Sequence, residues 1–269
     1  MAQFEALTFD FANNSSMNFG VYILDYGGSS GWVTENSGSN IRIIADSIPR
    51  RAEQFIYGVQ QNESQQFTVT IGSDSPKSRA EIDRIKSWLI QSKPKHLSVN
   101  QPDMDFYRYT GFFTNPRLIS SDNRQFGMTF TFVSTSPFAH TFPKQKSIDI
   151  NASANIIFNN ESGDIDYMYP LLKLTPANIT QNFSIVNDSD NGREFRFNFA
   201  APFPNGSEVI TVDNKNQIIT SSMGNDFSRR RFLQFNMNFL RFVRGVNTLR
   251  ITGNANFIIE YVFARRIGS

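Results

Sequence analysis

The chain has 269 residues, which is enough for one large or two ordinary domains, and 39% of them are hydrophobic, so packed cores can form. Its 26 basic and 24 acidic residues leave a net charge of +2, which provides no field that would recruit nucleic acid or anionic lipid. The absence of cysteine excludes disulfides, thiolate metal ligands and thiol nucleophiles within the chain.

Phenylalanine dominates the apolar composition and predicts a mainly β protein. The 27 Phe exceed the 11 Leu, and aromatic side chains favour pleated surfaces over helices. Short strands are expected over residues 4–11 and 21–24 and around residues 41–44, separated by polar stretches rich in glycine and serine. In residues 66–72 apolar and threonine side chains alternate with period two, the pattern of a half-buried strand.

One helix is predicted, over residues 76–91. Ser75 can cap its N-terminus, and Pro76 suits the first turn because the N–H that proline lacks would be unpaired there. The helix must end before Pro94. Its apolar residues recur at helical spacing and predict one buried face: Ile82, Ile85, Trp88 and Leu89. Trp88 is therefore interpreted as a core residue.

A change of character near residue 139 predicts a domain boundary. Residues 140–149 turn basic and lose apolar packing, so residues 1–139 and 150–269 are expected to form two domains joined by a linker. Short strands at regular intervals beyond the linker are typical of a β-sandwich. The expected strands are residues 156–158, 171–174, 183–186, 195–199, 209–212, 217–220, 232–235, 249–252 and 257–263.

Catalytic residues are not expected. Residues 27–31 match the Gly-x-Ser-x-Gly pattern of hydrolase nucleophile elbows, but the strand-like Trp32-Val33-Thr34 follows where that mechanism needs a helix. The two histidines, His96 and His140, have no orienting carboxylate nearby in sequence. We interpret them as surface or linker residues and residues 27–31 as a flexible loop, and keep the hydrolase hypothesis only as one to be tested.

No metal or cofactor site is expected either. Residues 188–192 begin like a calcium loop, but glycine stands at the third ligand position and the downstream pattern is missing, so a polar turn is favoured. Asp103 and Asp105 alternate in a turn and make only a weak pair. The sequence contains no phosphate-binding glycine loop of the Gly-x-x-x-x-Gly-Lys kind.

The strongest run of charge is Arg229-Arg230-Arg231, which precedes three phenylalanines: Phe232, Phe235 and Phe239. Basic residues with interleaved aromatics can bind single-stranded nucleic acid through backbone neutralisation and base stacking. We favour instead a solvated turn whose phenylalanines point into the sandwich. An acidic protein partner is the next alternative.

An ordered series of motifs runs from residue 81 to residue 139. It consists of Ile82, Ile85, Trp88 and Leu89 in the helix, Pro102 and Asp103 in a turn, Tyr107 and Tyr109, then Phe126, Met128, Phe130 and Phe132, and finally Pro137 and Phe138. The order and spacing resemble the distal tail protein family of long-tailed phages. In that family a helix ending near a Trp-Leu pair leads through such a turn into aromatic strands that stop before proline and an aromatic residue.

Motifs in the second half extend the resemblance over nearly the full chain. The Asn- and Gly-containing residues 159–163 precede Tyr169-Pro170, and residues 245–253 hold a Gly-x-Asn turn, a strand and a second glycine. The resemblance implies an N-terminal, tail-tube-like β-barrel or sheet domain with one helix, followed by a galectin-like β-sandwich domain.

The resemblance further implies a non-enzymatic structural protein of the virion that forms a six-membered ring at the distal end of the tail tube. The first domain would build the ring and the second would project outward. The partners would be further copies of the chain, the tail tube protein, and the tail hub or fibre protein, without sequence-specific nucleic acid and without cofactors.

Membrane insertion is not expected, because no apolar run approaches the roughly 18 residues of a spanning helix. Residues 1–5 lack the basic region of a signal peptide, so we expect a soluble protein made in the host cytoplasm.

The alternative function is a carbohydrate-binding module that recognises a host-surface glycan. Sugar sites usually stack an exposed aromatic ring, often Trp, on the ligand. Trp32 and Trp88 both lie in the first half, and the His-x-Asn-x-Arg and Trp-Gly motifs of galectins are absent after residue 150. Tyr167 and Tyr169 are the remaining candidates for such a site.

Overall fold

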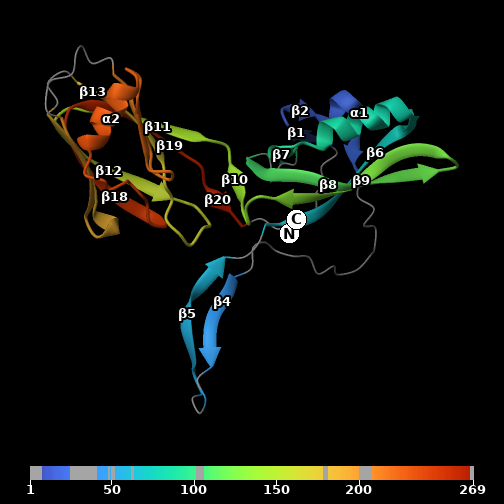
Figure 1. The fold of residues 1–269 in the computed structure, drawn as a ribbon, viewed down its shortest axis with the longest axis horizontal. Helices are drawn as coiled ribbons and strands as arrows, with labels where there is room; N and C mark the ends of the chain where they lie inside the picture. The colour runs from blue at the N-terminus through green and yellow to red at the C-terminus, as the bar shows by residue number, and fades with distance from the viewer. Residues whose placement is uncertain are drawn as a thin grey trace. The chain divides into compact units, whose positions relative to one another are not determined.

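The structure is a computed structural model, and it describes residues 8–24, 41–47, 49, 52–61, 64–100, 106–177, 181–199 and 208–266. The chain divides into two compact units, residues 1–142 with 265–269 and residues 143–264, and each unit has its own hydrophobic core. Antiparallel strands dominate both units (Figure 1), which confirms the mainly β prediction. Within the described ranges no helix has both the length and the apolar character needed to cross a membrane.

The main sheet of the first unit is antiparallel, with the strand order β2-β1-β7-β8-β9-β6-β3. The strands are β1 (Phe9–Phe11), β2 (Asn14–Ser15), β3 (Tyr22–Ile23), β6 (Gln66–Lys77), β7 (Lys95–Val99), β8 (Tyr107–Ser121) and β9 (Arg124–Ser134). β10 (Ala139–Thr141) pairs with β8 and with β20 (Ala264–Arg265). The side chains of β6 alternate as predicted, because Phe67, Val69 and Ile71 are buried and the threonines between them point to the other face.

Two glycines allow β6 and β9 to approach each other closely. Gly72 and Gly127 are cross-strand partners at the point where the register of the two strands shifts. A Cβ on Gly127 would lie 2.1 Å from the carbonyl oxygen of Ile71, which no side chain tolerates.

The helix α1 (Arg79–Leu89) covers the apolar face of this sheet, as Figure 1 shows, and is shorter than predicted. Ser78 and not Ser75 is the N-cap, because Ser78 and Glu81 form a reciprocal capping box. The hydrogen bond from Ser78 lowers the pKa of Glu81. Pro76 belongs to the end of β6, where Lys77 still pairs with Gln125 of β9. The expected cap at Ser75 was wrong because the strand continues past it.

Trp88 is a core residue, as predicted, and is 6% exposed. Its ring stacks on Phe19 with centroids 4.2 Å apart and on Phe9 with centroids 5.5 Å apart. Its indole Nε1–H donates a hydrogen bond to the carbonyl oxygen of Phe11 at 2.9 Å. Trp88 therefore ties α1 to β1 and to the short 3-10 helix η1 (Ser16–Phe19).

β4 (Ile41–Ser47) and β5 (Gln54–Gln61) form an antiparallel hairpin that is a sheet of its own (Figure 1). Its ladder is irregular between Ile44 and Ala45.

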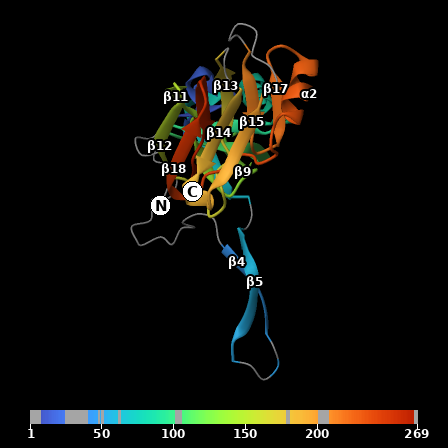
Figure 2. The same cartoon turned by 90° about the vertical axis from the view of Figure 1, so that its left-hand side faces the viewer.

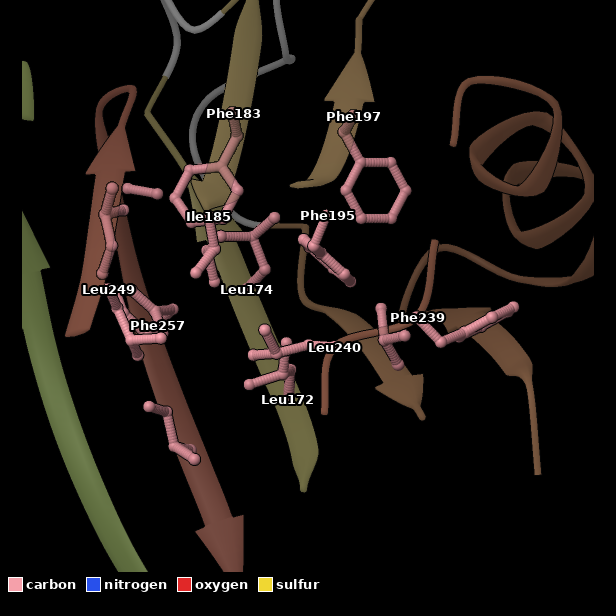
Figure 3. Packing of buried hydrophobic residues seen from close by; sticks show 14 of the residues in the cluster. Leu172, Leu174, Phe183, Ile185, Phe195, Phe197, Phe239, Leu240, Leu249 and Phe257 are labelled. Atoms are coloured by element: carbon pink, nitrogen blue, oxygen red, sulfur yellow. The ribbon is translucent and has the colours of Figure 1, made fainter. Parts of the chain in front are cut away.

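The second unit is a sandwich of two antiparallel sheets, one with the order β11-β19-β13-β16-β17 and one with the order β12-β18-β14-β15. The strands are β11 (Lys144–Ile150), β12 (Ser153–Asn160), β13 (Leu171–Pro176), β14 (Asn182–Asn187), β15 (Arg193–Asn198), β16 (Ile210–Asp213), β17 (Ile218–Ser221), β18 (Gly245–Thr252) and β19 (Ala255–Tyr261). Side chains of both sheets meet in one core, where Phe183 and Ile185 face Leu174 and Phe257 (Figure 3). The sandwich prediction is confirmed, while the likeness to galectins stays a prediction.

Two parts of the second half differ from the predictions. Residues 140–149, expected as a linker, contain the end of β10 and most of β11, which pairs with β19 along its full length. The expected strand at residues 232–235 is wrong, because residues up to Leu233 belong to a second helix, α2 (Asn225–Leu233). Asp226 in the first turn and Arg230 and Arg231 in the last turn complement the helix dipole. These charges, and not an apolar stripe, favour the helix.

An ion pair between Glu208 and Arg231 is buried in the second unit, with side chains 1% and 4% exposed. The Nε of Arg231 lies 3.0 Å and 3.2 Å from the two carboxylate oxygens. Ser221 donates a further hydrogen bond to Glu208, and Gln234 accepts one from Arg231. Burial alone raises the pKa of Glu208, but the hydrogen bonds from Arg231 and Ser221 outweigh it and hold that pKa below its ordinary value.

Replacing Trp88 with alanine should lower the free energy of unfolding of the first unit by about 3–5 kcal/mol, because it removes two ring stacks and leaves a cavity. Trp88→Phe is the matched control: it keeps an aromatic ring and loses the hydrogen bond to Phe11, which should cost about 1 kcal/mol. Urea unfolding followed by circular dichroism measures both. A loss below about 1 kcal/mol for Trp88→Ala would show that the ring is not part of the core.

Replacing Glu208 with glutamine should cost about 3–5 kcal/mol at neutral pH, because it leaves the Arg231 charge buried and unpaired. Since the folded-state pKa of Glu208 is lowered, its ionised form stabilises the fold above its ordinary pKa of 4.5 and that stabilisation is lost as the pH falls through the folded-state value. The stability difference between wild type and Glu208→Gln should therefore shrink below about pH 4. Urea unfolding as a function of pH tests this, with Glu194→Gln, in an exposed pair with Arg196, as a control that should change little. A gap that stays constant with pH would contradict this role.

Candidate assembly surfaces

The β4–β5 hairpin exposes apolar side chains on both of its faces. Ile43 (60% exposed) and Ile44 (46%) are neighbours in β4 and so point to opposite faces. In β5, Phe55 (54%) and Tyr57 (62%) share one face, with rings in edge-to-face contact, and Ile56 (60%) lies on the other. A lone two-stranded hairpin is only marginally stable in water, and exposed apolar clusters mark protein–protein contacts. The hairpin is therefore a surface that needs a covering partner.

The outer faces of the sandwich carry no aromatic side chain on any strand that the structure describes. The aromatic residues of these strands point inward: Phe158, Phe183, Phe195, Phe197 and Phe257 are buried, and Tyr261 packs edge-to-face on Phe158. Polar residues face outward, among them Lys173, which pairs with Glu260 across β13 and β19. The sheet faces therefore lack a ring on which a sugar could stack.

Tyr167 and Tyr169 are half-exposed and lie beside Arg241 and Asp190. A backbone bridge between Met168 and Phe242 brings these distant segments together. Asp190, buried, accepts hydrogen bonds from Arg241 at 2.8 Å and 3.1 Å, which raises the pKa of the guanidinium. Arg241 in turn lies 3.7 Å from the centroid of the Tyr167 ring and so covers one face of it. The sequence does not indicate Arg241 as a site residue, because nothing local marks a pairing that depends on a bridge between remote segments.

The arginine run does not form the expected turn. Arg229, Arg230 and Arg231 lie on α2, and Arg231 is buried against Glu208. Phe235 and Phe239 are in the core of the sandwich, as predicted, and so are unavailable for stacking on bases. The prediction was wrong for Phe232, which lies on α2 and is 41% exposed. Arg229 and Arg230 are exposed and share α2 with the exposed ring of Phe232, whereas stacking of successive bases of a single strand needs several rings.

The two histidines lie on strands of the first unit. The Nδ1 atom of His96, on β7, lies 3.0 Å from the hydroxyl oxygen of Thr110. Burial, and then the charges of Arg108 and Lys95, lower the pKa of His96. His140 is on β10, where its backbone pairs with that of Arg108. Positive charge rather than an orienting carboxylate thus surrounds His96.

The acidic turn at residues 188–192 is occupied by ion pairs. Asp188 to Asp190 form a 3-10 helix, η2, in which Asp188 binds Arg250 and Asp190 binds Arg241. In the part of the chain that the structure describes, no three His, Asp or Glu side chains gather in a way that could hold a metal ion. Several sequence candidates lie outside the described residues: residues 27–31, Trp32, Pro102, Asp103 and Asp105.

Comparison with known proteins places both halves of the chain among phage tail proteins. Residues 4–136 match a family described as "Phage tail protein N-terminal domain", and residues 138–261 match a "Phage tail C-terminal domain". A sequence comparison with curated proteins found no match.

Two solved structures share the fold over nearly their whole length. The Dit protein (gp 19.1) of phage SPP1, described as a paradigm of the hub adsorption apparatus in phages that infect Gram-positive bacteria, is 12% identical with a TM-score of 0.69, over 95% of this chain and 98% of its own. A chain of the phage P2 baseplate, in its activated conformation with Ca, is 9% identical with a TM-score of 0.50, over 94% of this chain and 97% of its own. These matches confirm the resemblance found in the sequence: the chain belongs to this family of phage tail proteins and has the fold of a distal tail protein.

Proposed function

We propose that the protein is a structural component of the phage tail tip that forms a six-membered ring at the distal end of the tail tube. The observation that carries this proposal is the β4–β5 hairpin, whose two apolar faces need cover that a single chain does not supply among its described residues. In a closed ring each hairpin is covered by the next subunit, and each subunit covers the hairpin of the one before. A repeated contact of this head-to-tail kind closes without leaving an exposed hairpin.

The ring connects the tail tube protein on one side with the tail hub and the receptor-binding or fibre protein on the other. The N-terminal domain, for which we propose residues 1–139, builds the ring, and the C-terminal domain, residues 150–269 beyond the segment 140–149, projects from it. The fold shared with the SPP1 Dit protein supports this role. The virion is therefore the proposed location, with synthesis in the host cytoplasm.

A structural role is favoured over carbohydrate binding. The sandwich turns its strand aromatics inward, and Arg241 covers one face of Tyr167, one of the two candidate rings. A sugar site needs an exposed, rigid aromatic in a shallow groove. The surroundings of His96 support a non-enzymatic role. They supply the positive charges of Arg108 and Lys95 and no carboxylate that would orient the histidine as a base.

Charging both faces of the hairpin should abolish ring formation. In the double variant Ile56→Asp with Tyr57→Asp, a carboxylate on each face would have to be buried in the ring contact, which is strongly unfavourable. We expect the solution mass of the full chain, measured by light scattering, to fall about sixfold while the fold is retained.

Leu233→Asp is the matched control, since Leu233 is 77% exposed on α2 of the other unit, and it should leave the mass unchanged. An unchanged mass in the hairpin variant would contradict the role of the hairpin. A wild-type chain that is strictly monomeric at high micromolar concentration would contradict the ring.

The full chain should show no saturable binding of cell-wall polysaccharide or simple galactosides in calorimetric titration, because the sheet faces offer no stacking ring. Tyr167→Ala and Tyr169→Ala should then be indistinguishable from wild type. Binding of millimolar or higher affinity that either substitution removes would replace the structural role of this domain with the carbohydrate-binding alternative.

A further inference from the structure

In the described ranges the sandwich has four sheet edges, of which three are protected and one is not. Along β15, Gln234 accepts a hydrogen bond from the N–H of Asn198, and Asn236 donates one to the carbonyl of Arg196. The short β17 is bounded by α2, whose Ser228 hydroxyl accepts from a backbone N–H of that strand. Each of these edges is thus covered by a neighbouring segment.

The two remaining edges belong to β11 and β12, which are consecutive in the chain. β11 carries Lys144 and Lys146, and lysine on an edge strand discourages pairing with another chain. β12 has the sequence Ser-Ala-Asn-Ile-Ile-Phe-Asn-Asn, with no charge, no proline and no register shift, and in the described ranges it pairs only with β18 (Figure 2). Eight residues of uncharged edge are an unusual feature in a protein that must stay soluble.

The free edge of β12 presents the backbone groups of its odd-numbered residues. The N–H of Gly253, next to β18, donates to the carbonyl of Ala152, so even-numbered residues face β18. The N–H of Ser153 turns the other way, to Asn151, and the carbonyl of Ile157 is reached by Lys146 of β11 at 3.4 Å. Since the N–H and C=O of one strand residue point to the same side, Asn155, Ile157 and Asn159 offer both groups to an incoming strand.

The same three residues point their side chains to the outer face of the sheet. Ile157 is 67% exposed, while its neighbour Phe158 is buried in the core. Val246 on β18, 60% exposed, is the diagonal neighbour of Ile157, because Val246 pairs with Asn159. The open edge is therefore flanked by a pair of exposed apolar side chains.

We propose that β12 is a homotypic contact, at which the β12 strands of two copies of this chain pair antiparallel about a two-fold axis through Ile157. The outward residues read Asn-x-Ile-x-Asn, which is symmetric about its centre. Two-fold pairing sets Ile157 against Ile157 of the second copy and each Asn155 against Asn159, so the two isoleucines meet and the amides can hydrogen-bond across the strands. In this pairing the carbonyl oxygen of Ile157 exchanges its 3.4 Å contact with the Nζ of Lys146 for a hydrogen bond from a backbone N–H of the second copy.

Because β12 is self-complementary, the β12 strand of a second copy fits its edge better than a strand of an unrelated protein does. Two-fold pairing joins the four-stranded sheets of two copies into one eight-stranded sheet, and it brings Ile157 and Val246 of both copies into one apolar stripe across the junction. An isologous contact pairs subunits and cannot itself propagate around a ring. It is thus separate from the hairpin contact of the proposed ring, and in the free protein it would join two rings face to face.

The solution mass of the full chain tests this pairing. Ile157→Lys places two lysines opposite each other at the two-fold axis, and like charges directly opposite are destabilising. We expect light scattering to give about half the wild-type mass. The matched control is Ile218→Lys on β17, an isoleucine of similar exposure (53%) on the other sheet, which should leave the mass unchanged.

This proposal and the ring can fail independently. A wild-type dimer that Ile157→Lys converts to a monomer would support the β12 contact and contradict the ring. A wild-type mass of a six-membered ring that Ile157→Lys does not change would overturn the β12 contact and leave the ring standing, including the case in which a different protein occupies the edge.

A covalent test exploits the absence of cysteine. In the proposed register the two Ile157 residues form a hydrogen-bonded pair, whose Cα atoms lie about 5.5 Å apart, within the range of a disulfide. Ile157→Cys should therefore give a single band at twice the chain mass on a non-reducing gel after mild oxidation, and Ile218→Cys should not. Equal cross-linking of both variants, or of neither, would overturn the two-fold pairing.

Discussion

The fold of both units depends on one constraint: along a strand, every second side chain must be buried. With no cysteine to join segments covalently, each sheet is stabilised by turning its phenylalanines to one face and its polar residues to the other. The inward rings of Phe195 and Phe197 belong to such a face, and in the first unit Trp88 of α1 packs on the buried face of the main sheet. One consequence is that the outer faces of the sandwich are mainly polar, with a few exposed apolar side chains such as Ile157, Val246 and Ile218.

The surfaces available for assembly are consequently the places where this pattern fails. The β4–β5 hairpin exposes Ile56 and Tyr57 on opposite faces, so no single core covers both. β12 follows the pattern across the sheet, yet among the described residues no strand pairs with its free edge beside Ile157. Both features expose groups that gain free energy when a second chain covers them, one through apolar burial and one through hydrogen bonding. Assembly through edges and hairpins suits a protein whose sheet faces are polar.

Local patterns predicted most of the fold, and contacts between remote segments account for the errors. The alternation of residues 66–72 and the helical spacing of Ile82, Ile85 and Leu89 are properties of single elements, and both predictions were right. Helix α2 was missed because its best-buried residue is Arg231, whose partner Glu208 lies on another segment. β11 was missed because its lysines look solvated, although pairing with β19 holds the strand in place. Arg241 lies beside Tyr167 because of the backbone bridge between Met168 and Phe242, which no sequence motif predicts.

The low identity to the SPP1 Dit protein is compatible with a common fold, because sheets tolerate many side chains that keep the alternation and the volume of the core. The same tolerance does not extend to contacts with partners, which depend on particular exposed residues. At 12% identity the fold is shared while the partner surfaces must be read from this chain itself. The proposed contacts are accordingly placed where exposed apolar residues of this chain gather, at the hairpin and at the Ile157–Val246 pair beside β12.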